Sequence, residues 1–244
     1  RRLTSHGREM LRMPEREERV VGVVIALVFF LLLGGSALRS PDGMEMLRLS
    51  ASWLGRSTDV GDPSFWPPLW SFLNMPTVAL GYDTAGARLL NLMCWGLLAW
   101  PLHSLASQLG GQRSGRISLI LYLLVPAFLG HSPVLDARAL GALISMSFIA
   151  AAVAALRRNS GLVWVLVFAA LAPLARPEGV LFPVFAAAVV WMLGNSWWKA
   201  VLAGGAAFLP HAMIRSSVRG FSGHEQLFAP WYGTWSTWDL LSLF

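Results

Sequence analysis

The stretch SPDGMEMLRLSASWLGRSTDVGDPSFWPPLW, Ser40–Trp70, decides how the rest of the chain is arranged. It directly follows an apolar run that is long enough to cross a bilayer. It nevertheless carries four carboxylates: Asp42, Glu45, Asp59 and Asp62. Because carboxylates are costly in hydrocarbon, this segment does not itself cross a membrane. We predict that it lies along the water–membrane boundary as an amphipathic helical loop, with two short helices separated at Phe65–Trp70 and with Trp53, Trp66 and Trp70 at the depth of the lipid headgroups.

The composition indicates an integral membrane protein. Of the 244 residues, 55% are hydrophobic and 13% are charged, and the apolar residues come in blocks near the length of a membrane span. Cys94 is the only cysteine, which excludes an intramolecular disulfide and a cysteine-based metal cluster. The formal charge of +6 comes from residues scattered between apolar blocks, so we expect no nucleic-acid partner. The chain opens on Arg1 rather than Met, and we expect a part of a longer protein.

The apolar blocks predict an all-α, polytopic transmembrane helix bundle. We expect about seven spans, at Val20–Leu38, Ala85–Leu109, Ile117–Gly130, Ala139–Leu156, Leu162–Ala175, Val180–Leu193 and Ala200–Met213. The positive-inside rule places residues 1–19, with six arginines against four glutamates, in the cytoplasm. The domains are then a cytoplasmic segment 1–19, a transmembrane domain 20–213 that includes an external loop 39–84, and an external aromatic-rich segment 214–244. We expect a bacterial inner membrane as the location.

This topology gathers ionisable residues on the external face. Nine of the thirteen acidic residues fall outside, and the four inside all belong to the N-terminal segment. Ionisable residues at the ends of spans usually face a cavity or each other, so they are candidates for function. The residues that emerge together are Asp42, Glu45, Asp136, Arg176, Glu178, His211 and Arg215.

Five short motifs, taken in their order along the chain, resemble those of the GT-C superfamily of integral-membrane glycosyltransferases. This superfamily includes protein O-mannosyltransferases and aminoarabinose transferases. The motifs are Ser40-Pro41-Asp42-Gly43, Phe65-Trp66-Pro67-Pro68-Leu69, Ala87-Arg88-Leu89-Leu90-Asn91, Leu135-Asp136 and Leu174-Ala175-Arg176-Pro177-Glu178-Gly179. The resemblance covers most of the chain. It implies transfer of a sugar from a polyprenyl-phosphate or polyprenyl-diphosphate carrier to an acceptor glycan, lipid or protein on the non-cytoplasmic face.

The resemblance also implies roles for individual residues. Asp42 is the expected catalytic base, because a hydroxyl acceptor needs a proton acceptor within hydrogen-bonding reach. Guanidinium groups match the oxygens of a leaving phosphate bidentately. The expected substrate-binding residues are Glu45, Arg88, Asp136, Arg138, Arg176, Glu178, His211 and Arg215. No residue is assigned as a metal ligand, although carboxylates with water suffice for a divalent cation, Mg²⁺ or Mn²⁺.

Structural roles compete with each of these assignments. Asp42 is a candidate helix N-cap, and Glu45 has the spacing of a helical ion pair with Arg48. Asp136 and Arg138 could mark the boundary of a span, and Arg176 and Glu178 could form an ion pair at a turn. His211 and Arg215 suit a lipid headgroup as well as a diphosphate.

Two other classes of protein fit the same sequence. One is a non-catalytic GT-C-like membrane subunit of a larger complex, and the other is a transporter. The enzyme hypothesis requires Asp42 and Asp136 to converge on an open, solvated cavity. If both residues point into lipid or into a packed protein interface, it fails.

Overall fold

The computed structural model describes residues 15–33, 38–56, 68–125 and 134–217. In these ranges the chain is mostly helical, with nine α-helices, one short 3₁₀ helix and two short strands. In chain order the elements are α2 (Glu15–Leu33), β1 (Leu38–Arg39), α3 (Pro41–Trp53), α4 (Pro68–Ala79), α5 (Asp83–Gly110), α6 (Gln112–Leu124), β2 (Val134–Leu135), α8 (Arg138–Arg158), α9 (Leu162–Ala175), η1 (Pro177–Leu181), α10 (Phe182–Met192) and α11 (Trp197–Ser217).

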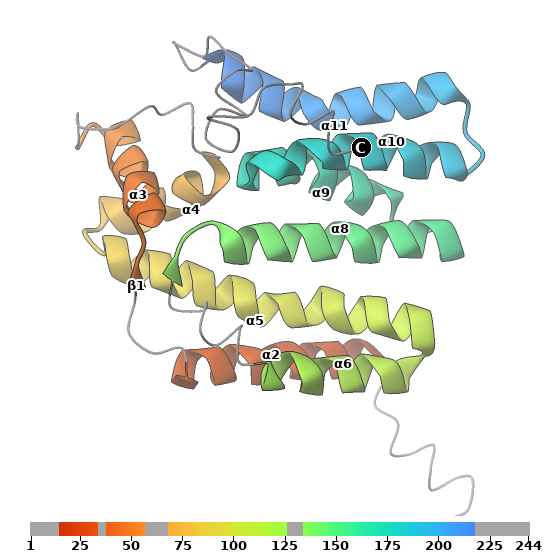
Figure 1. Cartoon of the computed structure of the whole chain (residues 1–244), viewed down its shortest axis with the longest axis horizontal. Helices are drawn as coiled ribbons and strands as arrows, with labels where there is room; N and C mark the ends of the chain where they lie inside the picture. Colours follow the sequence, from red (N-terminus) through yellow and green to blue (C-terminus); the bar gives the residue numbers. More distant parts are fainter. Residues whose placement is uncertain (1–14, 34–37, 57–67, 126–133, 218–244) are drawn as a thin grey trace, which may run out of the picture.

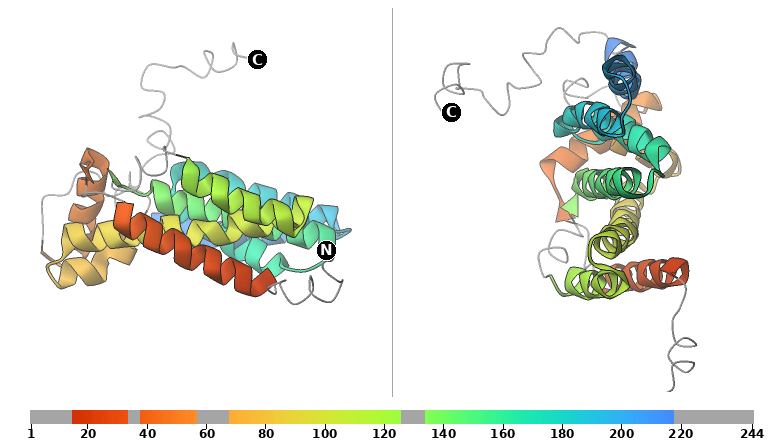
Figure 2. Two further views of the ribbon diagram at one scale, coloured as in Figure 1. Left: turned by 90° about the horizontal axis from the view of Figure 1, so that it is seen from below. Right: turned by 90° about the vertical axis from the view of Figure 1, so that its right-hand side faces the viewer.

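The long helices lie side by side in a stack (Figure 1). Helix α5 lies inside the stack and packs against α2, α6 and α8. Helix α8 packs in turn against α9, and α10 packs against α11. The view along the helix axes shows the same sequence of layers, from α11 to the pair α2 and α6 (Figure 2). Two hydrophobic clusters fill the stack, the larger one around Phe30, Trp95 and Ile144 and the smaller one around Phe148 and Val165.

Each of the seven predicted spans overlaps a helix, although residues 34–37 and 126–130 of the first and third spans lie outside the described residues, and the helix lengths do not support seven spans. Among the described residues, two helices are long and apolar enough to cross a membrane: α5 and α8. The helices at Leu162–Ala175 and Pro177–Met192 are apolar but shorter. The structure therefore supports a mostly helical protein with two candidate membrane-spanning helices.

Two short helices are present, but only α3 lies within Ser40–Trp70, because α4 begins at Pro68 in the block that was predicted to separate the helices and continues to Ala79. Figure 1 shows α3 crossing one end of the stack at a steep angle to the long helices. Its apolar face, including Leu47 and Leu49, is buried, and Arg48 on its other face is exposed. The hydroxyl of Ser50 donates to the Ser71 carbonyl at 2.8 Å and joins the two helices. The apolar face thus packs against the protein's own core.

Trp70, which was predicted to lie at the depth of the lipid headgroups, is packed inside the protein rather than exposed on its surface. Its side chain is fully buried, and its indole Nε1 donates to Asn91 Oδ1 at 2.9 Å. A buried indole N–H needs such a partner, and Asn91 supplies it from α5. Trp53 is 41% exposed, whereas Trp66 lies outside the described residues.

Strands β1 and β2 pair in parallel and fasten α3 to the beginning of α8. Leu38 pairs with Val134, and Arg39 pairs with Leu135. Asn91 supports the second strand, because its Nδ2 donates to the Val134 carbonyl at 2.6 Å. This short ladder places the residues that follow β1 next to the residues that follow β2.

Candidate functional site

The turn Ser40-Pro41-Asp42-Gly43 is built around the carbonyl of Leu135. Ser40 is the N-cap of α3: its Oγ accepts from the Gly43 N–H at 3.0 Å and donates to the Leu135 carbonyl oxygen at 2.6 Å. Pro41 occupies the first turn, where a missing N–H costs nothing. A Cβ on Gly43 would lie 1.6 Å from the Leu135 oxygen, so only glycine fits there. The serine and the glycine together hold the start of α3 against β2.

Asp42 lies exposed in the first turn of α3 and is not its N-cap. The alternative that Asp42 caps the helix is therefore wrong, because Ser40 already holds that position. A carboxylate in the first turn also interacts favourably with the positive end of the helix dipole. Since capping does not need Asp42, its carboxylate is available for another role.

Asp136 is buried where β2 leads into α8, with only 6% of its surface exposed. Its Oδ1 accepts from the backbone N–H of Arg138 at 2.8 Å, and its Oδ2 lies 3.0 Å from Arg138 Nε. Burial raises the pKa of Asp136, and the Arg138 N–H, the Arg138 charge and the Arg176 charge oppose that rise. The negative charge of Asp42 adds to it. The Asp42 carboxylate therefore lies within electrostatic range of Asp136.

Arg176 and Glu178 form a bidentate ion pair at the junction of α9 and η1. Arg176 Nε lies 3.1 Å from Glu178 Oε2, and the second guanidinium nitrogen lies 2.9 Å from Oε1. This hydrogen bonding lowers the pKa of Glu178, and it raises the pKa of Arg176. The arginine stem crosses Gly141 of α8 so closely that a Cβ there would lie 2.3 Å from Arg176 Cδ. The predicted ion pair at this turn is confirmed.

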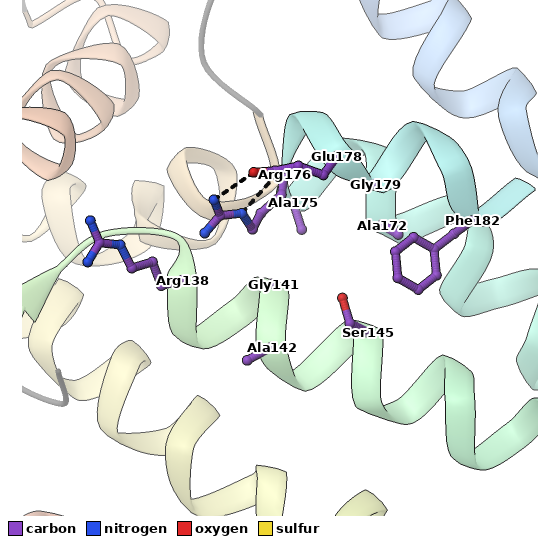
Figure 3. Close-up of a pocket in the computed structure, with 10 residues that line it drawn as sticks. All are labelled: Arg138, Gly141, Ala142, Ser145, Ala172, Ala175, Arg176, Glu178, Gly179 and Phe182. Atoms are coloured by element: carbon purple, nitrogen blue, oxygen red, sulfur yellow. Dashed lines mark hydrogen bonds and ion pairs between the residues drawn. The ribbon is translucent and has the colours of Figure 1, made fainter. Parts of the chain in front are cut away.

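A cavity of about 300 Å³ opens between α8, the end of α9, and η1 (Figure 3). Its polar lining comes from Arg138, Ser145, Arg176 and Glu178, and Phe182 closes one side. Neither Asp42 nor Asp136 lines this cavity, so the expected convergence of the two carboxylates on one open cavity is not seen here. The two arginines connect it to Asp136, because both charges act on that carboxylate. The structure thus brings together Asp42, Asp136, Arg138, Arg176 and Glu178 at one end of the stack.

The remaining predicted site residues are Glu45, Arg88, His211 and Arg215. Glu45 pairs with Arg48 at 2.6 Å, which confirms the helical ion pair. Arg88 lies in the second turn of α5, and its buried Nε has no hydrogen-bond partner among the described residues. His211 is buried in α11, whose neighbours are α10 and α9. The backbone of Arg215 belongs to the same helix, and its side chain lies outside the described residues.

Several residues that build the site were not predicted as part of it. Ser40, Gly43 and Asn91 occur in the quoted motifs, but their roles depend on contacts with the remote segment Val134–Leu135. The place of Ser145 in the cavity could not be predicted from the sequence, because an isolated serine in an apolar helix has no distinguishing pattern. In the part of the chain that the structure describes, no group of three or more His, Cys, Asp and Glu side chains is placed to hold a metal ion.

We compared the chain with known protein families, curated proteins and solved structures. No protein-family model, no curated protein and no solved structure matches this chain. Function is therefore inferred from the residues and from their geometry.

Proposed function

We propose that this chain belongs to a membrane glycosyltransferase of the GT-C type, which moves a sugar from a polyprenyl-phosphate or polyprenyl-diphosphate carrier to an acceptor on the non-cytoplasmic face. One observation carries the proposal. A two-residue ladder holds exposed Asp42 within electrostatic range of buried Asp136, at the same end as the cavity lined by Arg138 and Arg176. This grouping joins a candidate base to cationic groups that suit a phosphate.

In the proposed reaction the Asp42 carboxylate acts as the base, and the guanidinium groups of Arg138 and Arg176 stabilise the leaving phosphate. The Asp42 carboxylate takes the proton of the acceptor hydroxyl as the new bond forms between its oxygen and the anomeric carbon. The bond from that carbon to the carrier phosphate breaks, and the phosphate oxygen keeps the electron pair. Arg138 and Arg176 offset the charge that develops on this oxygen. Asp136 positions Arg138, since both of its oxygens engage that residue.

A divalent cation fits the proposal as a ligand of carboxylates and phosphate. Mg²⁺ is commonly held in proteins by one or two carboxylates together with substrate phosphates and water. Asp42 and Asp136 are the residues that would hold Mg²⁺ or Mn²⁺ here. The ion would supply additional charge to the leaving phosphate.

The proposal places the protein in a bacterial inner membrane with its N-terminus in the cytoplasm. Helices α5 and α8 cross the bilayer, and the other helices of the stack pack beside them. The junctions α5–α6, α8–α9 and α10–α11 share one end of the stack with the beginning of α2, which supports this arrangement (Figure 1). Arg113 and Arg116 follow the α5–α6 junction and Arg157 and Arg158 precede the α8–α9 junction, and basic residues beside short junctions favour a cytoplasmic location.

A second candidate is a non-catalytic GT-C-like subunit of a membrane complex. Two observations favour it. The guanidinium of Arg176 is already engaged by Glu178, and neither Asp42 nor Asp136 lines the cavity. In this case the same end of the stack would bind a partner subunit rather than a lipid-linked sugar.

The test is sugar transfer by the purified protein in detergent, with radiolabelled polyprenyl-phosphate sugars and a lysate of acceptors. We expect Asp42→Asn to lower turnover by roughly 10²-fold or more, the usual scale for the loss of a general base, with little change in donor binding. Folding survives because Ser40 caps α3. Glu45→Gln is the matched control, since Glu45 pairs with Arg48 on the exposed side of the same helix.

Three results would count against catalysis by Asp42. One is wild-type turnover in Asp42→Asn, and a second is an equal loss in Glu45→Gln. The third is no transfer by the wild-type protein, which would favour the non-catalytic subunit.

A further inference from the structure

A second cavity lies near the opposite end of the stack from Asp42. It measures about 390 Å³ and is formed between α5, α8 and α9. Helix α5 contributes Trp100 and Gln108, helix α8 contributes Ala154, and helix α9 contributes Trp164 and Phe168. The proposed transfer reaction uses none of these residues.

The cavity, called the slot below, has a largely apolar lining that suits a hydrocarbon chain. Trp164 is 58% exposed and stacks on Phe168, with ring centroids 5.9 Å apart. Three alanines of α8, including Ala154, line the slot and leave space between the flanking aromatic rings. Aromatic rings at the edge of a membrane protein lie at headgroup level, where they flank acyl chains.

One polar group at the end of the slot lacks a partner. Gln108 Nε2 donates to the Ala150 carbonyl at 3.3 Å and to Ser104 Oγ at 3.2 Å. The Ala150 carbonyl can only accept a hydrogen bond, so the side-chain nitrogen of Gln108 must face it. This fixes the orientation of the Gln108 side-chain amide. Gln108 Oε1 is buried and has no hydrogen-bond partner among the described residues. A buried acceptor without a partner is unfavourable, so this oxygen suits a ligand that brings a hydroxyl donor.

Cationic side chains lie beside the same end of the slot. A guanidinium nitrogen of Arg157 donates to the Gln108 carbonyl, and Arg158 follows it in an exposed position. Arg19 of α2 lies over the ring of Trp100, with 5.2 Å between its guanidinium carbon and the ring centroid. No carboxylate lines the cavity. The charge beside this slot therefore complements an anion.

We infer that this cavity binds an anionic glycerophospholipid. Its acyl chain lies between Trp164 and the alanines of α8, and its phosphate lies at Arg157 and Arg158. A headgroup hydroxyl donates to Gln108 Oε1. Basic pockets between membrane helices on the cytoplasmic side bind anionic headgroups in this way. The inference requires that the helices lie in a bilayer, but it does not require sugar transfer.

The experiment measures lipid retention by the full chain, purified in detergent, using native mass spectrometry. The probes are palmitoyl-oleoyl phosphatidylglycerol and its phosphatidylcholine counterpart, each added separately. We expect wild-type protein to retain phosphatidylglycerol preferentially. The double variant Arg157→Gln/Arg158→Gln should lower its retention roughly tenfold or more, because each arginine near an anionic group contributes several-fold to binding.

Two further variants distinguish the slot from a general effect of charge. Arg113→Gln/Lys199→Gln removes the same charge from α6 and α11, two helices that do not line the cavity, and it should leave retention unchanged. Ala154→Leu should fill the slot and lower retention without removing any charge, since Arg113, Arg157, Arg158 and Lys199 are all kept. A thermal transition close to that of the wild type shows that each variant is folded.

Three results would overturn the inference. Equal retention of both lipids by the wild type would show a neutral site for hydrocarbon. Equal loss in the two charge variants would show that only the overall charge matters. Unchanged retention in Ala154→Leu and in Arg157→Gln/Arg158→Gln would place the lipid elsewhere. Because no sugar is involved, these results are independent of any failure of the transferase assay.

Discussion

Gly43 has no room for a side chain, and this makes it a sensitive position in the turn that carries Asp42. A Cβ would meet the backbone oxygen of Leu135 at 1.6 Å and its carbonyl carbon at 2.6 Å. Backbone atoms in a paired strand cannot move aside as the end of a flexible side chain can. A substitution at Gly43 must therefore separate α3 from β2.

We predict that Gly43→Ala lowers the free energy of unfolding by about 2 kcal/mol or more, as overpacking commonly does. Gly205→Ala is the matched control, because nothing lies within 4 Å of the position that its Cβ would occupy and alanine favours a helix. The midpoint of thermal unfolding in detergent measures both variants. Equal midpoints would mean that α3 does not contact Leu135 closely.

The buried carboxyl of Asp136 predicts a dependence of stability on pH. Burial raises its pKa in the folded protein above the ordinary value of 3.8, so the folded state binds more protons than the unfolded state between those two values. Stability from this group is then greatest at low pH and falls as pH rises through that window. Glu178 has the opposite sign: its lowered pKa contributes stability above its ordinary value, and that stability is lost as pH falls.

We expect the difference in melting temperature between wild type and Asp136→Asn to change with pH. The wild type should lose stability relative to the variant as pH rises from 3.8, since the variant has no proton to release at this position. Melting curves at several pH values from about 3.5 to about 6.5 would measure it. A difference that stays constant, or that moves in the opposite direction, would contradict the raised pKa.

Among the elements, the short ladder of β1 and β2 positions the candidate site. Two residue pairs and the Ser40 hydroxyl attach α3 to the beginning of α8. Ser40→Ala removes the N-cap of α3 and one hydrogen bond to the Leu135 carbonyl, and we predict a loss of about 2 kcal/mol in stability.

Ser52→Ala is the control for this loss, because Ser52 donates to the Leu49 carbonyl within α3 itself. It should change stability by less than about 0.5 kcal/mol, as is usual away from caps and cores. Chemical or thermal unfolding of the two variants provides the comparison. A Ser52 variant as unstable as the Ser40 variant would argue against a special role for the ladder.

The sequence predicted the helices better than it predicted their contacts. Apolar blocks bounded by arginine, glycine and proline located every long helix, because these features act over neighbouring residues. The ion pairs Glu45–Arg48 and Arg176–Glu178 were predictable for the same reason. The ladder was not, since strands of two residues have no periodic pattern and their partners lie far apart in the chain. The burial of Trp70 depends on Asn91 of another helix and was missed for that reason.

At the scale of the whole molecule, the ends of the stack differ in charge. Described acidic residues beyond α2 belong to the end that contains α3, and Arg113, Arg157 and Arg158 lie at the other. If the stack lies in a bilayer, the arginines beside the short junctions α5–α6 and α8–α9 indicate that their end faces the cytoplasm, although other arginines lie at the end that contains α3. The proposed topology therefore depends on the chain as a whole.

We predict that Ser57→Cys reacts with a membrane-impermeant maleimide in intact cells, whereas Ser114→Cys reacts only after the membrane is permeabilised. The variants are made in a Cys94→Ala background, so that each contains one cysteine. Ser57 belongs to the predicted external loop, and Ser114 follows the α5–α6 junction. Labelling of Ser114→Cys but not of Ser57→Cys in intact cells would invert the orientation.

The bond between Ser40 and Leu135 also has a consequence for biogenesis. The two residues are 95 positions apart, so a ribosome that adds about 5–20 residues per second makes the second one roughly 5–20 s after the first. During that interval the nascent α3 has no β2 to dock on. Helices α2, α4, α5 and α6 are therefore synthesised before α3 can dock on β2, and the candidate site is among the last parts of this half of the chain to be assembled.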